Sequence, residues 1–130
     1  MEKRKHITEM KYEEKNMLRK IVKQNKFVFS DHCIKRTMQR RVMVTDIVKT
    51  IRKGNIIEFH VVGDSIRVLL RGKPNGKDKC PCVVLNVGTK EVVTVYHNYK
   101  YNHHQYSKRT LYSKDLDICS LVQPYLKKCN

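Results

Sequence analysis

The chain has 130 residues, of which 40% are hydrophobic and 31% charged, a balance that favours one folded domain with a heavily charged surface over a disordered chain. Its 28 Lys and Arg residues against 12 Asp and Glu give a formal net charge of +16, divided as +5 over residues 1–26, +7 over 27–96 and +4 over 97–130. Because the centre of the chain is as basic as its ends, a basic tail does not explain the charge. A polyanionic partner is favoured, and a merely solvated lysine-rich surface is the alternative.

Membrane, secreted and metal-binding classes are disfavoured by the same composition. No run of about 18 apolar residues occurs, so we expect no membrane span, and residues 1–26 lack the apolar core of a signal peptide. An odd, scattered set of cysteines favours reduced thiols in the cytoplasm over a disulfide framework. Cys80 and Cys82 are too close for the usual zinc pair, so we expect neither a metal nor a cofactor. The cysteines are Cys33, Cys80, Cys82, Cys119 and Cys129.

Three helices are predicted in the N-terminal half, where apolar residues recur at helical spacing between capping residues. Ser30 with Asp31 suits the start of the second helix, and Thr45 or Asp46 suits the start of the third. Gly54 is a typical helix stop. The predicted helices are Glu9–Asn25, Asp31–Arg41 and Asp46–Lys53, with a short extended segment at Phe27–Phe29.

Four strands are predicted next, each rich in Val, Ile and Leu and bounded by turn residues. Gly63-Asp64 and Gly88-Thr89 fit tight hairpin turns, whereas residues 72–81 fit a longer polar loop. A last helix is predicted within Leu111–Cys129, interrupted at Pro124. Helices followed by a meander of strands predict an α+β fold, with N-terminal helices packed on a four-stranded antiparallel sheet and a C-terminal extension. The predicted strands are Asn55–Val62, Ser65–Arg71, Cys82–Val87 and Glu91–Tyr96.

The second helix and the last strand carry residues suited to phosphodiester chemistry. His32, Arg36 and Arg40 stand at i, i+4 and i+8, which places them along one stripe of the helix. Simple alternation places Thr94 and Tyr96 on one face of the last strand, and Val93, Val95 and His97 on the other. RNA can be cut without a metal because its own 2′-OH is the nucleophile, so the enzyme needs proton-transfer groups and cations. The alternative is a solvated basic helix face beside an ordinary strand.

Together these segments resemble a known family. The segments that carry the resemblance are Phe29-Ser-Asp-His-Cys-Ile-Lys-Arg-Thr-Met-Gln-Arg-Arg-Val-Met-Val-Thr-Asp-Ile-Val48, Gly54-Asn-Ile-Ile-Glu58 and Val92-Val-Thr-Val-Tyr96. They are similar to small bacterial domains that begin S-x-H-x-x-x-R-x-x-x-R and end I-x-T-V-Y. Those domains resemble the BrnT-type toxins of the barnase–EndoU–colicin–RelE (BECR) ribonuclease superfamily. The likeness covers about residues 27–98.

The resemblance implies a helical pair on a four-stranded antiparallel sheet, metal-free RNA cleavage and an acidic antitoxin or immunity protein as inhibitory partner. By position it assigns His32 as general acid or base, Arg36 and Arg40 to the scissile phosphate, and hydroxyl contacts to Thr94 and Tyr96. His97 is the second proton-transfer candidate. The sequence departs from the family at Arg41, where a Gly usually ends the first motif helix, and Arg41 adds a cation to the expected RNA-binding surface.

We therefore expect one domain over residues 1–130, made of a basic N-terminal helix (1–26), a ribonuclease-like core (27–98) and a Tyr/His-rich extension (99–130). Aromatic and basic residues interleave in the extension, a pattern suited to stacking on single-stranded RNA. The alternative is a tyrosine-rich edge that packs on the sheet. The expected RNA-binding residues are Arg41, Tyr99, Lys100, Tyr101, His103, His104, Tyr106, Lys108 and Arg109.

The function expected from these features is a metal-independent endoribonuclease toxin, which cleaves RNA by attack of the 2′-OH on the phosphodiester. Two alternatives account for the charge without catalysis. One is an RNA-binding module, which would show salt-sensitive binding and no cleavage. The other is a basic interaction protein that docks an acidic partner.

Overall fold

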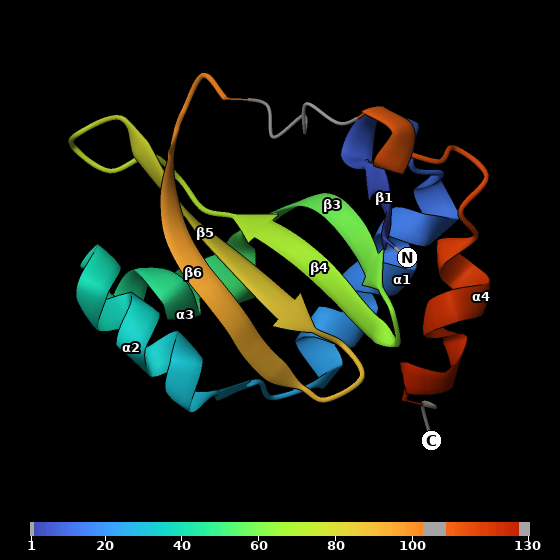
Figure 1. Cartoon of the computed structure of the whole chain (residues 1–130), viewed down its shortest axis with the longest axis horizontal. Coiled ribbons are helices and arrows are strands. Elements are labelled where there is room, and N and C mark those ends of the chain that lie inside the picture. The colour runs from blue at the N-terminus through green and yellow to red at the C-terminus, as the bar shows by residue number, and fades with distance from the viewer. Residues whose placement is uncertain (1, 103–108, 128–130) are drawn as a thin grey trace.

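The computed structural model describes residues 2–102 and 109–127, and its centre is one six-stranded sheet in the order β1-β3-β4-β5-β6-β2 (Figure 1). The strands are β1 Glu2–His6, β2 Val28–Phe29, β3 Asn55–Val62, β4 Ser65–Arg71, β5 Lys79–Asn86 and β6 Glu91–Tyr99. The α-helices are α1 Tyr12–Gln24, α2 Asp31–Arg40, α3 Val44–Lys53 and α4 Ile118–Val122, and the 3-10 helices are η1 Ile7–Glu9, η2 Arg109–Leu111 and η3 Gln123–Tyr125.

The α+β class is confirmed, but the predicted four-stranded antiparallel sheet is too narrow. β1 adds an antiparallel strand along β3, with Glu2 opposite Val62, and β2 adds a short parallel strand along β6, with Val28 opposite Glu91. The sheet is therefore mixed. β1 was not predicted because its five residues are Glu, Lys, Arg, Lys and His, and the sequence signal for a strand depends on apolar residues.

Several predicted boundaries are wrong by two to three residues. α1 begins at Tyr12 rather than Glu9, because residues 7–9 form a 3-10 turn. α3 begins at Val44, since Met43 occupies the cap position that was assigned to Thr45 or Asp46. β5 begins at Lys79, and β6 extends beyond Tyr96 to Tyr99. The last helix is only α4 followed by η3, and Pro124 lies in η3.

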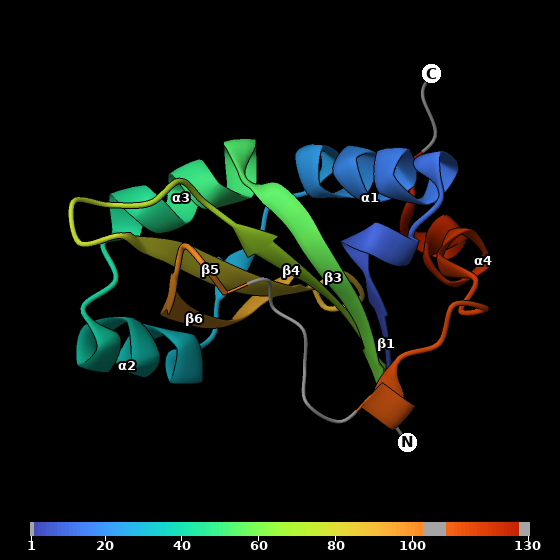
Figure 2. The same ribbon diagram turned by 90° about the horizontal axis from the view of Figure 1, so that it is seen from above.

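The main hydrophobic core lies between the sheet and the helices α1 and α3, which run along the same side of it (Figure 2). Leu18 and Ile21 of α1, Ile47 of α3 and Phe59 of β3 are fully buried there. Each such side chain contributes about 1.5–3 kcal/mol through burial of apolar surface. α2 lies beside β6 at one edge of the sheet, and α4 packs on α1.

The opposite face of the sheet carries a smaller apolar cluster of Leu69, Cys82 and Val84, against which Tyr96 packs. Between α2 on one side and η2 on the other, no helix of the described residues covers this face (Figure 2). We call it the open face. Side chains on it are held by a rigid sheet, and they range from fully buried, as Cys82 is, to half-buried, as Tyr96 is. A binding or catalytic surface needs side chains that are held in this way.

Candidate active site

The stripe of His32, Arg36 and Arg40 on α2 follows from the N-cap of the helix and from the side of the helix that is buried. Ser30 accepts a hydrogen bond from the backbone N–H of Cys33 at 3.0 Å, and Cys33 is fully buried against the core. The residue before it, His32, is therefore exposed, and Arg36 donates from Nε to Nε2 of His32 at 3.4 Å. The helix ends at Arg41, whose φ of 52° and ψ of 40° place it in the left-handed conformation that Gly adopts most easily.

Arg40 connects α2 to the edge of the sheet. Its Nη1 donates to the backbone carbonyl of Val95 at 2.9 Å and lies 3.4 Å from Oγ1 of Thr94. β2 pairs with β6 only at Glu91 and Val92, so this carbonyl belongs to the part of the edge that β2 leaves uncovered. The structure thus brings Arg40 and Thr94 together, and it brings His32 and Arg36 together one and two turns earlier on α2.

The faces of β6 differ from simple alternation because of a bulge. Val84 lies opposite Thr94 whereas Leu85 lies opposite Val92, so Val93 is an extra residue in β6. The prediction that Val93 faces the same side as Val95 is therefore wrong, because Val93 packs in the open-face cluster with Tyr96. Val95 lies in the main core.

His97 is separated from Thr94 and Tyr96 by the sheet. It follows Tyr96 in β6 and lies opposite Pro81. Because successive residues of a strand point to opposite faces, His97 is directed to the helix-covered side while Tyr96 is on the open face. His97 does not join Thr94 and Tyr96 in one site.

Tyr96 is half-buried on the open face, in the part of β6 that β2 leaves uncovered and opposite Cys82 of β5. Burial raises its pKa far above the ordinary value, and the nearby Cys82 and Glu58 act in the same direction. The guanidinium groups of Arg4 and Arg40 act in the opposite direction. The Tyr96 hydroxyl is thus a protonated hydrogen-bond donor, and it lies within electrostatic reach of cations from β1 and from α2.

Next to Tyr96 the open face carries an ionic cluster that the sequence did not predict, formed by Arg4, Glu58, His60 and Tyr112. Oε1 of Glu58 lies 2.7 Å from Nε2 of His60 and accepts from Nη1 of Arg4 at 3.0 Å. The hydroxyl of Tyr112 donates to Oε2 of Glu58 at 2.9 Å. We call these four residues the Glu58 cluster. It combines a carboxylate, an imidazole, a guanidinium and a phenol around one point.

The charge of Glu58 is fixed by these contacts. Its side chain is only 1% exposed, and burial alone would raise the pKa of the carboxyl. The hydrogen bond and charge of His60, the Tyr112 hydroxyl and the Arg4 charge outweigh burial, so the pKa of Glu58 lies below its ordinary value. Glu58 is therefore a carboxylate, and the side chain of His60, 10% exposed, is the more accessible of the two titratable groups.

The Glu58 cluster could not be found by spacing because its members come from three separate parts of the chain. Only Glu58 and His60 are neighbours in sequence, and their spacing of two residues places both on one face of β3. A Glu-x-His pair inside an apolar strand was the available signal. Arg4 comes from the unpredicted strand β1, and Tyr112 comes from the extension, where it bridges to Arg4.

The described part of the extension presents aromatic rings to solvent. Tyr99 is 61% exposed and Tyr101 is 70% exposed, with Lys79 Nζ 5.4 Å from the first ring and Lys100 Nζ 5.1 Å from the second. Arg71 holds the turn that carries them by donating to the backbone carbonyls of residues 99, 100 and 102 at 2.6–3.1 Å. Arg109 begins η2. The predicted residues His103, His104, Tyr106 and Lys108 lie outside the described residues.

Two further features bear on the kind of chemistry available. Within residues 2–102 and 109–127, no three His, Cys, Asp or Glu side chains gather in a way that would hold a metal ion, and no helix is long and apolar enough to cross a membrane. Cys82 lies beneath the open face, where burial raises the pKa of its thiol to about 12. Its sulfur is therefore protonated and is not suited to act as a nucleophile.

Comparison with known protein families gives one match. Residues 29–97, more than half of the chain, match the family described as domain of unknown function DUF4258. No curated protein and no solved structure matches the chain. The matched segment includes α2, Glu58, His60 and Tyr96, whereas Arg4 and Tyr112 lie in the segments on either side of it.

Proposed function

Because the chain belongs to the DUF4258 family, in which no function is assigned to the shared segment, we propose its function from the open face: a metal-independent endoribonuclease of the toxin kind that acts in the cytoplasm. The observation that carries this proposal is the approach of Arg40 from α2 to β6 beside Tyr96, where its Nη1 donates to the carbonyl of Val95 at 2.9 Å and lies 3.4 Å from Oγ1 of Thr94. Arg40 and Arg4 both lie within electrostatic reach of the Tyr96 hydroxyl, and Arg4 is also paired with Glu2 and Glu58. A phosphodiester seated at Tyr96 would thus lie near two guanidinium groups.

Such an arrangement meets the chemical needs of metal-free RNA cleavage. A base removes the proton of the 2′-OH, the 2′ oxygen attacks phosphorus, and the bond from phosphorus to the 5′ oxygen breaks. An acid then protonates the leaving 5′ oxygen, which leaves a 2′,3′-cyclic phosphate and a 5′-hydroxyl. Proton transfer by positioned side chains contributes about 10²–10⁴-fold, and cations stabilise the charge that develops on the phosphate.

His60 is the proton-transfer group in this proposal. Its Nε2 lies 2.7 Å from the Glu58 carboxylate and 3.3 Å from Nη1 of Arg4, and these contacts fix the position of the ring. Arg4 and Arg40 contact the phosphate, and Tyr96 donates to one of its oxygens. His32, paired with Arg36 on α2, is the competing proton-transfer group that the sequence resemblance implies.

The experiment is incubation of the purified protein with total bacterial RNA in excess EDTA, read on a denaturing gel. We expect discrete cleavage, loss of cleavage of about 10²-fold or more in His60→Ala, and a smaller loss in His32→Ala. A substrate with 2′-deoxyribose at the cleaved position must resist cutting. Loss of RNA cleavage in His32→Ala, with full activity in His60→Ala, would assign the proton-transfer role to His32 of α2.

Thermal unfolding of both variants serves as the control, because the Glu58 cluster also holds β1 and Tyr112 on the sheet. A His60→Ala protein that melts near the wild-type temperature and does not cleave supports catalysis. Absence of cleavage by the wild-type protein, with salt-dependent RNA binding intact, would favour the RNA-binding module instead.

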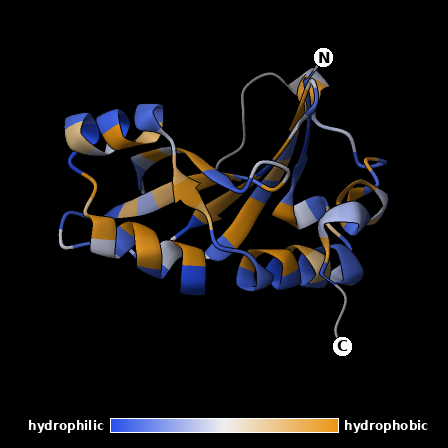
Figure 3. Cartoon of the chain, turned by 90° about the horizontal axis from the view of Figure 1, so that it is seen from below, coloured by the Kyte–Doolittle hydropathy of each residue, from blue (hydrophilic) through white to orange (hydrophobic). Residues whose placement is uncertain are grey.

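We also propose an acidic inhibitory protein as partner, which docks at the end of the molecule where α2 and α3 both lie (Figure 2). Five apolar side chains there are at least 43% exposed, and Figure 3 shows apolar stretches on both helices. Exposed cations surround them, including Lys35 and Lys49, so an acidic surface with apolar side chains is complementary. The apolar side chains are Ile34, Met38, Met43, Val44 and Val48.

A small acidic protein encoded in a reading frame next to that of this chain would provide the test of this partner. Coexpressed with the chain, it should copurify and suppress RNA cleavage. Met38→Lys with Val48→Lys should break the complex, whereas Tyr12→Lys, at a site that is 73% exposed on α1, should not. Equal loss in both variants would contradict the docking surface.

A further inference from the structure

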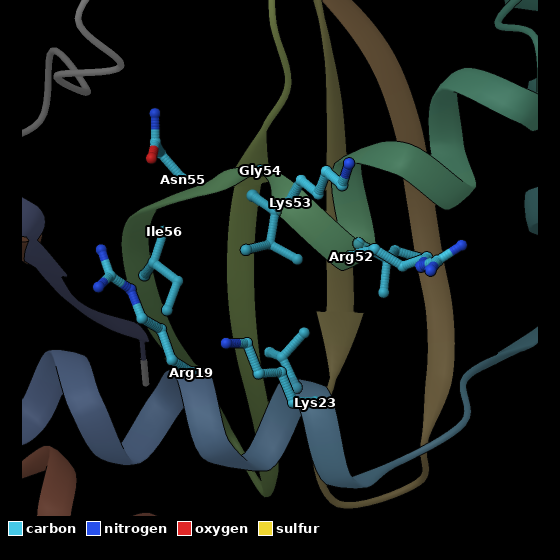
Figure 4. A pocket seen from close by; sticks show the side chains of 10 residues that line it. Arg19, Lys23, Arg52, Lys53, Gly54, Asn55 and Ile56 are labelled. Atoms are coloured by element: carbon cyan, nitrogen blue, oxygen red, sulfur yellow. The ribbon is translucent and has the colours of Figure 1, made fainter.

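A cavity of about 210 Å³ opens between α1, the C-terminal end of α3 and the first residues of β3, on the side of the sheet opposite the open face (Figure 4). Its walls include the apolar side chains of Val22, Ile51, Ile56 and Leu70. The cavity therefore lies outside the site described above and has an apolar interior.

Four cations line the same cavity. Arg19 and Lys23 come from α1, and Arg52 and Lys53 come from the last turn of α3 (Figure 4). All four are exposed, and no salt bridge joins any of them to an acidic group within the described residues. No acidic residue lines the cavity. The only other polar side chain in the lining is the amide of Asn55.

A favourable interaction with the helix ends explains only part of this charge. Cations in the last turn of a helix are stabilised by its macrodipole, which applies to Lys23, Arg52 and Lys53. Arg19 lies a full turn earlier in α1, and the macrodipole falls off within the last turn. Two helices that are separated in sequence thus contribute exposed cations to the lining of one cavity, where an anion would find positive charge on both sides.

The close approach of α3 to the sheet gives this cavity fixed walls. A Cβ on Gly54 would meet the backbone oxygen of Thr50 and would lie 2.9 Å from the backbone oxygen of Arg71. Gly54 therefore lets the end of α3 lie directly against β4. The cations of α3 are held on a rigid element, which lowers the entropy lost when a ligand binds.

We propose that this cavity binds a nucleotide unit of an RNA strand, with the base or ribose against the apolar wall and the phosphates on Arg19, Lys23, Arg52 and Lys53. The proposal rests on the proposed function, in that RNA is the substrate, and adds a second contact surface on the far side of the sheet. Guanidinium and ammonium groups suit phosphate oxygens. The apolar wall suits a sugar or base, which a nucleotide has and an inorganic anion lacks. A strand cleaved at the open face would then be held at two separate places.

The test is binding of a fluorescein-labelled single-stranded RNA of 2′-O-methyl ribose, measured by fluorescence anisotropy over a range of salt concentrations. The methyl group removes the nucleophile, so binding is measured without cleavage. Lys23→Gln with Lys53→Gln removes two charges from the cavity. Lys20→Gln with Lys49→Gln removes two charges from exposed positions on the same two helices outside the cavity, and is the matched control.

We expect the cavity variant to bind about tenfold more weakly and its salt slope to fall by about 0.7 for each phosphate that the protein no longer neutralises, with a much smaller change in the control. Because all the altered residues are exposed, both variants should melt at the wild-type temperature. Arg19→Gln with Arg52→Gln gives an independent second measurement.

Three results would overturn the inference, and they differ in what else they affect. Equal weakening of RNA binding in the cavity and control variants would contradict binding of RNA in the cavity. It would not contradict binding of RNA by the protein. Binding of a nucleoside monophosphate that the cavity variant weakens, without an effect of that variant on strand binding, would assign the cavity to a free nucleotide. Failure of the wild-type protein to bind the RNA would remove the proposed function together with the inference.

Discussion

The carboxylate of Glu58 and the imidazole of His60 lie 2.7 Å apart on the same face of β3, and the side chain of Glu58 is 1% exposed. A buried carboxylate of this kind depends on its partners, because removal of one partner leaves a charge without compensation in a medium of low polarity. The contacts of Glu58 therefore influence both the stability of the fold and the charge of the open face.

Acid should destabilise the protein through Glu58. The native pKa of Glu58 lies below the ordinary value of 4.5. The contribution of Glu58 to the free energy of unfolding is therefore complete above pH 4.5 and is lost as the pH falls through the native pKa. Glu58→Gln should lower the free energy of unfolding at pH 7 by about 3 kcal/mol and flatten its fall between pH 5 and pH 3, measured by urea denaturation. The exposed Glu13→Gln is the control. Parallel acid limbs in the two variants would refute this assignment.

Replacement of Arg41 by Gly should stabilise the chain. Arg41 has φ 52°, a left-handed conformation that costs an ordinary residue about 1–2 kcal/mol relative to Gly. We expect Arg41→Gly to raise the free energy of unfolding by about 1 kcal/mol in thermal or urea denaturation. Arg41→Ala removes the same charge and keeps the conformational cost, so a gain of equal size in Arg41→Ala would contradict the explanation.

Replacement of Gly54 by Ala should destabilise the chain, because the added methyl group meets two backbone oxygens that belong to α3 and β4. Overpacking of this kind costs about 1–3 kcal/mol, which urea denaturation would detect as a lower midpoint. A methyl group added at Gly76 would have no heavy atom within 4 Å, so Gly76→Ala is the matched control and should be close to neutral.

The exposed tyrosines of the extension should contribute to RNA binding without contributing to stability. Tyr99→Ser with Tyr101→Ser should weaken binding of single-stranded RNA by about 1–3 kcal/mol for each stacked base, measured by anisotropy. Tyr12 is 73% exposed on α1, so Tyr12→Ser is the control. A fall in the melting temperature of the double variant, with unchanged binding, would instead support packing of the tyrosines on the sheet.

The sequence was sufficient for the elements that carry apolar periodicity. β3 and β4 match their predicted bounds, and α2 matches within one residue, because Ser30 and the turn residues define their ends. β1 was not predicted, since a strand of charged residues has no periodic signal, and β2 was predicted only as a short extended segment at Phe27–Phe29. Each is defined only by the strand with which it pairs.

The candidate site was likewise predictable from the sequence only in part. Regular geometry relates residues within one element, so the contact of His32 with Arg36 follows from helical spacing. Arg40 and Thr94 are 54 residues apart, and sequence resemblance rather than geometry placed them in one site. The bulge at Val93 and the contact of Tyr112 with Glu58 depend on tertiary packing that spacing does not encode.

The contacts of Glu58 span nearly the whole chain, since Arg4 precedes it by 54 residues and Tyr112 follows it by 54. During synthesis on the ribosome, the strand that carries Arg4 emerges first and must wait for β3 before it can pair. Tyr112 emerges later still. A nascent chain therefore lacks the completed open face until about residue 112 has left the ribosome. The buried carboxylate of Glu58 therefore gains its last hydrogen-bond partner only at the end of synthesis.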